Sequence, residues 1–313
     1  MRHALTLFLL LSCCLCATAQ DTAVTVDKHV FILPSVIVHN KLDYASILRR
    51  IKNDTTFYKA FKTLRTINYT AYNDIKIPDK KGAIKASYNS KTIQHRVNGC
   101  RTTEFVEQHT TGDFLDGRGN YNYTTGDMYA GLFFSKTKVC GENNIVAGSV
   151  ITTDGKSGMD KHREQLKMLF FNPGKKIPGI PFIGNKLDLY DDDAHKLYDY
   201  RLDFISYQGS YVYVFSVKPK PDLGFFRRSD VVVDEMTTWF DFKTMEVLKR
   251  VYKLSYKAAV YDFDVDMEVE LAHTPDGMLV PKTMRYKGNY GILFKKRERG
   301  EFTATLFDFK KGS

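Results

Sequence analysis

The chain contains few of the residues that catalytic and metal-binding motifs require. Its 313 residues include 8 histidines, 5 cysteines and a single tryptophan. No histidine stands in a His-Glu-x-x-His spacing, and the sequence has neither a Gly-x-Ser-x-Gly nucleophile motif nor a phosphate-binding loop. The sequence therefore offers no basis for predicting an enzyme, a cofactor or a metal site.

Long apolar runs are equally scarce. After Gln20 no stretch approaches the roughly 18 uncharged apolar residues that a membrane-spanning helix needs. The apolar run 4–11 follows Arg2 and precedes Ala17-Thr18-Ala19, which is the pattern of a cleavable secretory signal. We therefore predict a signal peptide over residues 1–19 and one exported domain over residues 20–313, periplasmic or associated with the outer membrane. A lipid anchor at Cys13, in Leu10-Leu11-Ser12-Cys13, is the second interpretation.

Cysteine is nearly absent from the predicted mature chain. Cleavage after Ala19 leaves Cys100 and Cys140, whose spacing matches no metal-ligand motif. In an oxidising compartment, two such cysteines indicate one disulfide. The bond would close a loop of about forty residues, for which the chain-entropy model gives roughly 4 kcal/mol of stabilisation.

Charge of one sign is not concentrated in any long segment. The 46 Lys and Arg against 36 Asp and Glu give a formal net charge of +10, and the excess is scattered in short pairs such as Arg227-Arg228. Such pairs usually keep a surface soluble, and they also suit an anionic membrane surface. No nucleic-acid recognition motif is present, so nucleic acid is not an expected partner.

An alternating segment carries the main structural signal. Residues 261–271 read YDFDVDMEVEL, with apolar and acidic residues in strict alternation. Because successive side chains of a strand point to opposite faces, this period of two predicts a strand with one apolar and one acidic face, in an antiparallel sheet with one solvated side. The preceding run, 246–257, places Lys249, Lys253 and Lys257 on a single face, where a hairpin would pair them with the acids. Arg250 interrupts the apolar face of that run. This position is expected to mark either the rim of the apolar face or a contact with a ligand.

Elsewhere, the pattern predicts three helical regions and many strands. Apolar spacings of three and four predict helices over 43–65, with Asp43 as cap and a break at Asn53-Asp54, over 121–135 and over 159–171. Short hairpin turns such as Lys287-Gly288-Asn289 and Arg299-Gly300 separate the later extended segments. The expected strands are 67–77, 82–88, 93–97, 101–106, 198–206, 211–217, 231–241, 246–256, 261–271, 278–287, 291–298 and 301–309.

These elements predict an α+β fold, mainly antiparallel β. We expect a large curved sheet or incomplete barrel, covered on its concave apolar face by helices. The apolar loop 177–184, rich in proline and glycine, is expected to pack against the sheet or to close over a cavity.

Several segments resemble the lipoprotein-carrier (LolA-like) superfamily of bacterial envelope proteins. The extended run 211–220 ends in VKPK, and residues 236–244 (MTTWFDFKT) are similar to the family's aromatic-Asp-x-x-Thr hairpin. Residues 277–282 (GMLVPK) resemble its Gly-x-x-x-Pro entry into a late strand. The resemblance implies an incomplete antiparallel barrel with a helix-covered cavity for acyl chains. The 100–140 region looks like an addition to this plan, and no residue is matched to the carriers' ligand-gating arginine.

We therefore hypothesise a non-catalytic envelope protein that holds an apolar ligand, a lipid or the acyl chains of a lipoprotein, between sheet and helices. Adaptable methionine and broad aromatic surfaces suit such a cavity. Two alternatives stay open. The aromatic and methionine residues of the predicted cavity pack a dry core, or the protein is an envelope or outer-membrane-associated interaction protein without an internal ligand. The predicted cavity residues are Tyr213, Phe215, Trp239, Tyr252, Phe263, Met267, Met128, Phe133, Met168 and Phe171.

Overall fold

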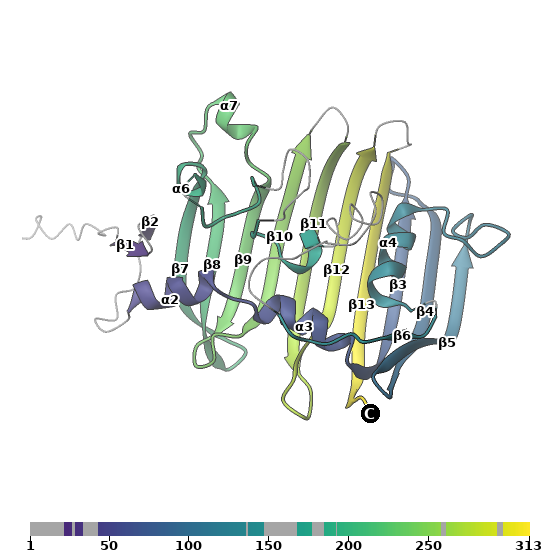
Figure 1. Cartoon of the computed structure of the whole chain (residues 1–313). Helices are drawn as coiled ribbons and strands as arrows, with labels where there is room; N and C mark the ends of the chain where they lie inside the picture. Colours follow the sequence, from purple (N-terminus) through teal and green to yellow (C-terminus); the bar gives the residue numbers. More distant parts are fainter. Residues whose placement is uncertain are drawn as a thin grey trace, which may run out of the picture.

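The computed structural model describes residues 22–26, 29–33, 43–135, 137–146, 168–176, 185–191, 193–257, 261–292 and 297–313. An open antiparallel sheet dominates this part of the chain, with α2, α3 and α4 on one of its faces (Figure 1). The helices are α2 Tyr44–Lys52, α3 Thr56–Leu64, α4 Thr124–Phe133, α6 Ala194–Leu197 and α7 Phe225–Arg228. The strands are β1 Thr22–Val26, β2 His29–Leu33, β3 Ile67–Pro78, β4 Ile84–Val97, β5 Cys100–Thr111, β6 Val139–Cys140, β7 Tyr198–Tyr207, β8 Ser210–Pro219, β9 Val233–Asp241, β10 Val247–Lys257, β11 Tyr261–His273, β12 Leu279–Ile292 and β13 Glu298–Lys311.

The large sheet has eleven strands in the order β6-β5-β4-β3-β13-β12-β11-β10-β9-β8-β7. Every neighbouring pair is antiparallel. From β7 to β13 the strands form a meander, and β13 then pairs with β3, so the early and late strands of the chain share one sheet. The α+β fold with a large antiparallel sheet covered by helices is as expected from the alternating pattern.

The hairpin of β10 and β11 confirms the predicted charge ladder. Lys249 lies opposite Glu270, Lys253 opposite Asp266 and Lys257 opposite Asp262. Lys249 Nζ lies 2.6 Å from Glu268 Oε1, and Lys253 Nζ lies 3.5 Å from Asp266 Oδ1. The other side of the same two strands is buried. We call this buried, helix-covered side of the sheet the inner face and the charged side the outer face.

Two short helices replace the single broken helix expected over residues 43–65. Asp43 caps α2 by accepting a 3.0 Å hydrogen bond from Ser46 N, as predicted from its position before the apolar repeat. The break falls at Asn53, also as predicted, and α3 begins at Thr56. Each helix buries one apolar stripe, which is why both lie on the sheet instead of projecting into solvent. The buried residues are Ile47, Leu48, Ile51, Phe57, Ala60, Phe61 and Leu64.

The predicted turns at residues 287–289 and 299–300 were wrong, because these residues lie within the two long strands β12 and β13. Gly288 and Gly300, expected in turns, lie opposite each other within the sheet. A Cβ at Gly288 would collide with the Tyr286 hydroxyl, and one at Gly300 with the Thr125 side chain at the start of α4. Both glycines therefore serve close packing on the inner face, a role that glycine inside a strand often has.

A disulfide and an ion pair fasten the early edge of the sheet. Cys100 and Cys140 are bonded, as predicted, and pair across β5 and β6. Two residues later, the Glu142 carboxylate accepts hydrogen bonds from Arg101 and lies 3.4 Å from Arg65 Nη1 at the end of α3. The segment that leaves the sheet after β6 is thus tied both to the strand edge and to a covering helix.

Some predictions lie wholly or partly outside the described residues. They include the signal peptide over 1–19 with the alternative lipid anchor at Cys13, the apolar loop 177–184 and the middle of the strand expected over 291–298. Most of the helix expected over 159–171 also lies outside them, and its residues 168–171 are described and helical. Among the helices that are described, none has the length and apolar character needed to cross a membrane.

Candidate ligand-binding face

The inner face gathers nine of the ten predicted cavity residues into one apolar cluster. Seven of them are buried: Tyr213, Phe215, Tyr252, Met267, Phe133, Met168 and Phe171. Met128 and Phe263 are partly buried and pack against the same cluster. The alternation of each strand decides which side chains point inward, and the helices contribute theirs from the opposite side.

Trp239, the tenth, lies on the outer face instead. The inward residues of β9 are Met236, Thr238 and Phe240, so Trp239 points to the charged side, where Lys249 Nζ lies 5.7 Å from its ring centre. It pairs across the strands with Val214, which is buried although it too points outward. The expectation that the largest aromatic residue faces inward fails because Trp239 covers a small apolar patch on the outer face of β8 and β9.

Aromatic rings form two contact chains on the inner face. Phe57, Phe61 and Phe171 make one, with ring centres 5.3 and 4.7 Å apart. The second runs from Phe170 through Tyr286 and Phe302 to Tyr129 of α4, with separations of 5.3, 4.8 and 4.8 Å. Residues 168–171 contribute to both chains and so connect α3 with β12 and β13.

Buried polar bonds help to attach the covering segments to the sheet within this apolar surface. The Tyr252 hydroxyl of β10 donates to the carbonyl of Phe170 at 2.8 Å, and the Tyr129 hydroxyl of α4 donates to Asn73 Oδ1 of β3 at 2.6 Å. Burial raises the pKa of both tyrosines above the ordinary value, so each hydroxyl stays a neutral donor. These bonds set the position of the cover, because a buried hydroxyl without a partner is costly.

Arg250 forms a buried ion pair between sheet and cover. Its Nη2 lies 3.3 Å from Asp54 Oδ2, and the two side chains are only 7% and 5% exposed. Arg250 Nε also donates to Thr238 Oγ1 at 2.9 Å, and its guanidinium lies 4.3 Å from the ring centre of Phe57. Asp54 in turn accepts a 2.8 Å hydrogen bond from Thr56 N, at the start of α3. The buried pair therefore joins the centre of β10 to the junction of α2 and α3.

Further charges lie close to this ion pair. Lys175 donates to the carbonyl of Lys52 at the end of α2 and lies 4.5 Å from the ring centre of Tyr190. Burial lowers the pKa of Lys175 to about 8, the neighbouring Arg250 acts in the same direction, and Asp54 opposes them. Burial also raises the pKa of Asp188 nearby. The hydrogen bonds and charges of this cluster join the end of α2, Lys175 and the centre of β10.

Side chains nearly fill one pocket under the cover. The pocket between α3, α4 and the first strands, lined by Phe61, Leu64, Arg65, Tyr69, Gln94, Arg101, Leu132, Phe133 and Phe171, has a volume of about 10 Å³. That is barely enough for one water molecule. In this conformation an acyl chain can enter there only if α3 or residues 168–171 move away from the sheet.

Sequence reasoning identified the apolar residues of this face but not its polar attachment. Arg250 interrupts an apolar alternation, which is a usable signal in the sequence. Asp54 indicates only a helix break, because an acid at a break is common and its partner lies 196 residues away in the chain. No residue near Phe170 in the sequence indicates that its carbonyl accepts a hydrogen bond from the Tyr252 hydroxyl.

Three solved structures are similar to this chain. A DUF1329 family protein from Desulfovibrio piger ATCC 29098 is 12% identical, with 86% of this chain and 91% of that chain covered and a TM-score of 0.25. A putative outer membrane lipoprotein-sorting protein domain from Vibrio parahaemolyticus is 11% identical, with 85% and 91% covered and a TM-score of 0.26. A LolA superfamily protein from Nitrosomonas europaea is 9% identical, with 83% and 94% covered and a TM-score of 0.25.

Neither a protein-family model nor a curated protein sequence matches the chain. The similarity is therefore one to LolA-superfamily and DUF1329 structures. At these identities and TM-scores it assigns no function.

Proposed function

We propose that this protein binds an apolar ligand, a lipid or the acyl chains of a lipoprotein, between the inner face of its sheet and the covering helices, without catalysis. The observation that carries the proposal is the construction of the cover. Separate short segments, α3, α4 and residues 168–171, lie on a broad aromatic surface and are attached to it by packing and side-chain hydrogen bonds, not by strand pairing. Such a cover can be lifted from the sheet without unpairing any strand.

The composition of this surface supports the same proposal. Met267 and Met284 lie on neighbouring strands beneath the cover, and Met168 lies within it. Flexible thioethers and broad aromatic rings adapt to a chain of variable length and shape better than branched residues do. The predicted export to the periplasm or outer membrane would place the protein where acylated ligands occur.

A brominated fatty acid tests the proposal, because bromine quenches tryptophan emission only at short range. The native Trp239 lies on the outer face and serves as the internal control. In a Trp239→Phe background, Phe171→Trp places the fluorophore in the cover on the inner face. After delipidation, we expect the brominated acid to quench the tryptophan at position 171 strongly and native Trp239 weakly.

Two results would contradict an internal ligand site. The first is equal quenching at both positions, which indicates surface adsorption. The second is no uptake by the wild-type protein together with no lipid in mass spectra of the natively purified protein. Circular dichroism of the Trp239→Phe, Phe171→Trp variant establishes that it has folded before either result is interpreted.

The filled interior favours a second candidate function, that of an interaction protein without an internal ligand. The pocket of about 10 Å³ on the inner face is what a permanently packed core looks like. Under this alternative the protein co-purifies with a stoichiometric partner and carries no lipid. Native mass spectrometry distinguishes the two candidates in one measurement.

A further inference from the structure

The connection between β8 and β9 exposes two adjacent phenylalanines. Phe225 and Phe226 of α7 are each 86% exposed, more than any other large apolar side chain among the described residues. Their rings contact each other, with centres 5.8 Å apart, and α7 projects beyond the ends of the strands (Figure 1). Such a pair has no role in the folded core, and placing it in water is unfavourable unless something covers it.

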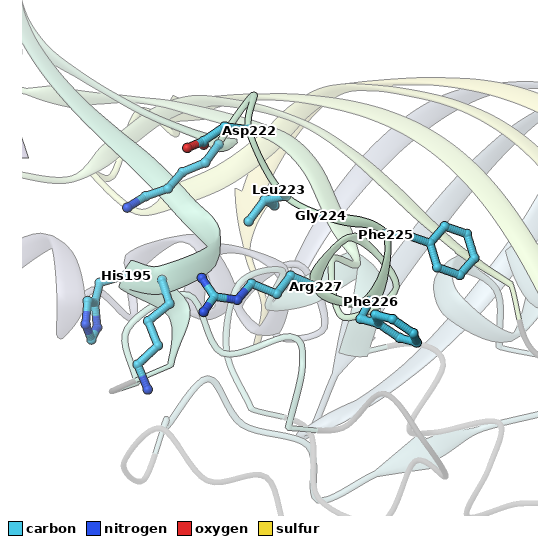
Figure 2. A pocket seen from close by; sticks show the side chains of 9 residues that line it. His195, Asp222, Leu223, Gly224, Phe225, Phe226 and Arg227 are labelled. Atoms are coloured by element: carbon cyan, nitrogen blue, oxygen red, sulfur yellow. The ribbon is translucent and has the colours of Figure 1, made fainter.

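Cationic side chains lie beside the two rings. A surface pocket of about 590 Å³ is lined by His195, Lys196, Lys220, Asp222, Leu223, Gly224, Phe225, Phe226 and Arg227. Figure 2 shows the two phenylalanines pointing away from Arg227, whose guanidinium extends toward His195. Residues 218–230 carry four cationic side chains and two carboxylates, a local excess of two positive charges.

Not all of these cations have partners within the chain. Lys196 pairs with Asp193 at 2.7 Å, and Arg228 lies 3.5 Å from Asp234. Within the part of the chain that the structure describes, Arg227 and Lys220 form no ion pair, and Arg227 is exposed. An exposed apolar tip with adjacent unpaired cations is complementary to a surface that is apolar inside and anionic outside.

We propose that the α7 tip, defined as Phe225, Phe226 and Arg227, docks on a lipid bilayer that contains anionic phospholipid. The two rings enter the boundary between headgroups and acyl chains, while Arg227 and Lys220 meet the headgroup phosphates. Aromatic residues suit this boundary, and arginine binds phosphate through paired hydrogen bonds. The docking surface lies outside the inner face, so this proposal does not depend on an internal acyl-chain site.

Vesicle flotation with the full chain tests the docking. We expect binding to phosphatidylcholine vesicles that contain about a quarter phosphatidylglycerol, and little binding to phosphatidylcholine alone. High salt should weaken binding, because at 1 M the screening length falls to about 3 Å.

Two double variants separate the apolar and the electrostatic contributions. Phe225→Ser with Phe226→Ser should lower vesicle affinity about tenfold or more. Lys220→Gln with Arg227→Gln should lower it about thirtyfold, since each cation near an anionic surface contributes about fivefold. The matched controls are Tyr211→Ser, another exposed aromatic residue, and Lys80→Gln with Lys81→Gln, which removes the same charge from the turn between β3 and β4. Both controls should bind as the wild type does.

A tryptophan at the tip reports insertion directly. Phe225→Trp should gain blue-shifted emission on anionic vesicles, and brominated phospholipid should quench that gain while native Trp239 is unaffected.

The proposal is overturned if the wild-type protein does not bind anionic vesicles, or if the Phe225→Ser, Phe226→Ser variant binds them normally. Lipid-independent dimers that this variant abolishes would also overturn it, because a second copy would then cover the tip. Vesicle binding without uptake of fatty acid would refute the internal site and leave the docking proposal standing.

Discussion

The two faces of the β10–β11 hairpin use charge in opposite ways. On the outer face, Lys253 and Asp266 are 46% and 53% exposed and lie 3.5 Å apart. On the inner face, Arg250 and Asp54 are 7% and 5% exposed at a similar distance of 3.3 Å. Alternate residues of one strand thus supply both an exposed ladder and a buried ion pair.

The comparison shows that burial, and not separation, decides what an ion pair contributes. The exposed pair is screened by water, so either partner can be lost at little cost. In the buried pair, removing one partner leaves a charge in an apolar environment, where it cannot be solvated. The outer charges therefore keep the hairpin in register and soluble, whereas the inner pair holds α2 and α3 on the sheet.

The largest effect is expected from Asp54→Asn, which leaves Arg250 buried without a counter-ion. We expect a loss of about 4 kcal/mol in unfolding free energy, within the range known for breaking buried pairs. Urea denaturation followed by circular dichroism measures it. Asp43→Asn is the matched control, because asparagine caps helices as well as aspartate does and the side chain at this position is exposed. Equal effects of the two substitutions would show that the Arg250–Asp54 pair contributes nothing beyond capping.

Met267→Ala tests the apolar part of the same face. Met267 is 3% exposed, so its truncation should cost about 3 kcal/mol through lost burial and the cavity left behind. The neighbouring Asp266→Ala, on the outer face, should cost under about 0.5 kcal/mol. Denaturation midpoints of the two variants measure the contrast between adjacent residues. Comparable losses would contradict the assignment of inner and outer faces.

Lys175→Met sharpens the comparison through pH. Because the pKa of Lys175 in the folded protein, about 8, lies below that of an unfolded lysine, the charged form destabilises the fold. The wild-type stability should therefore be lowest below pH 8 and should rise as the pH increases from about 8 towards 10. The variant should be more stable than the wild type at pH 7 by about 2 kcal/mol.

Thermal unfolding of both proteins between about pH 7 and 9.5 tests this, since tyrosines begin to titrate only near pH 10. The stability difference between variant and wild type should shrink as the pH rises. A difference that does not change with pH would mean that Lys175 is not desolvated in the folded protein.

The smallest effect is expected from Lys253→Gln on the outer ladder. Exposed cross-strand pairs contribute about 0.5 kcal/mol, and added salt should remove even that difference. Denaturation at low and at high ionic strength measures it. A loss approaching that of Asp54→Asn would erase the distinction between the two faces.

Local patterns predicted those parts of the molecule in which neighbouring residues decide the conformation. The alternation of residues 261–271 placed the acids outside, the spacing over 43–65 predicted helix with a cap at Asp43 and a break at Asn53, and two cysteines predicted the disulfide. Local reading failed at Gly288 and Gly300, because a turn and a close packing contact both favour glycine. It failed at Trp239 because hydrophobicity alone does not tell which face of a strand has room for a large ring.

The sequence by itself determined which residues alternate, where helices begin and that a large sheet must bury one side. These properties depend on the geometry of a few consecutive residues. Only the tertiary structure decided that Asp54 meets Arg250 and that the Tyr252 hydroxyl donates to the carbonyl of Phe170. Those contacts join segments separated by 82 to 196 residues, and the packing of helices on the sheet, not any local preference, brings them together.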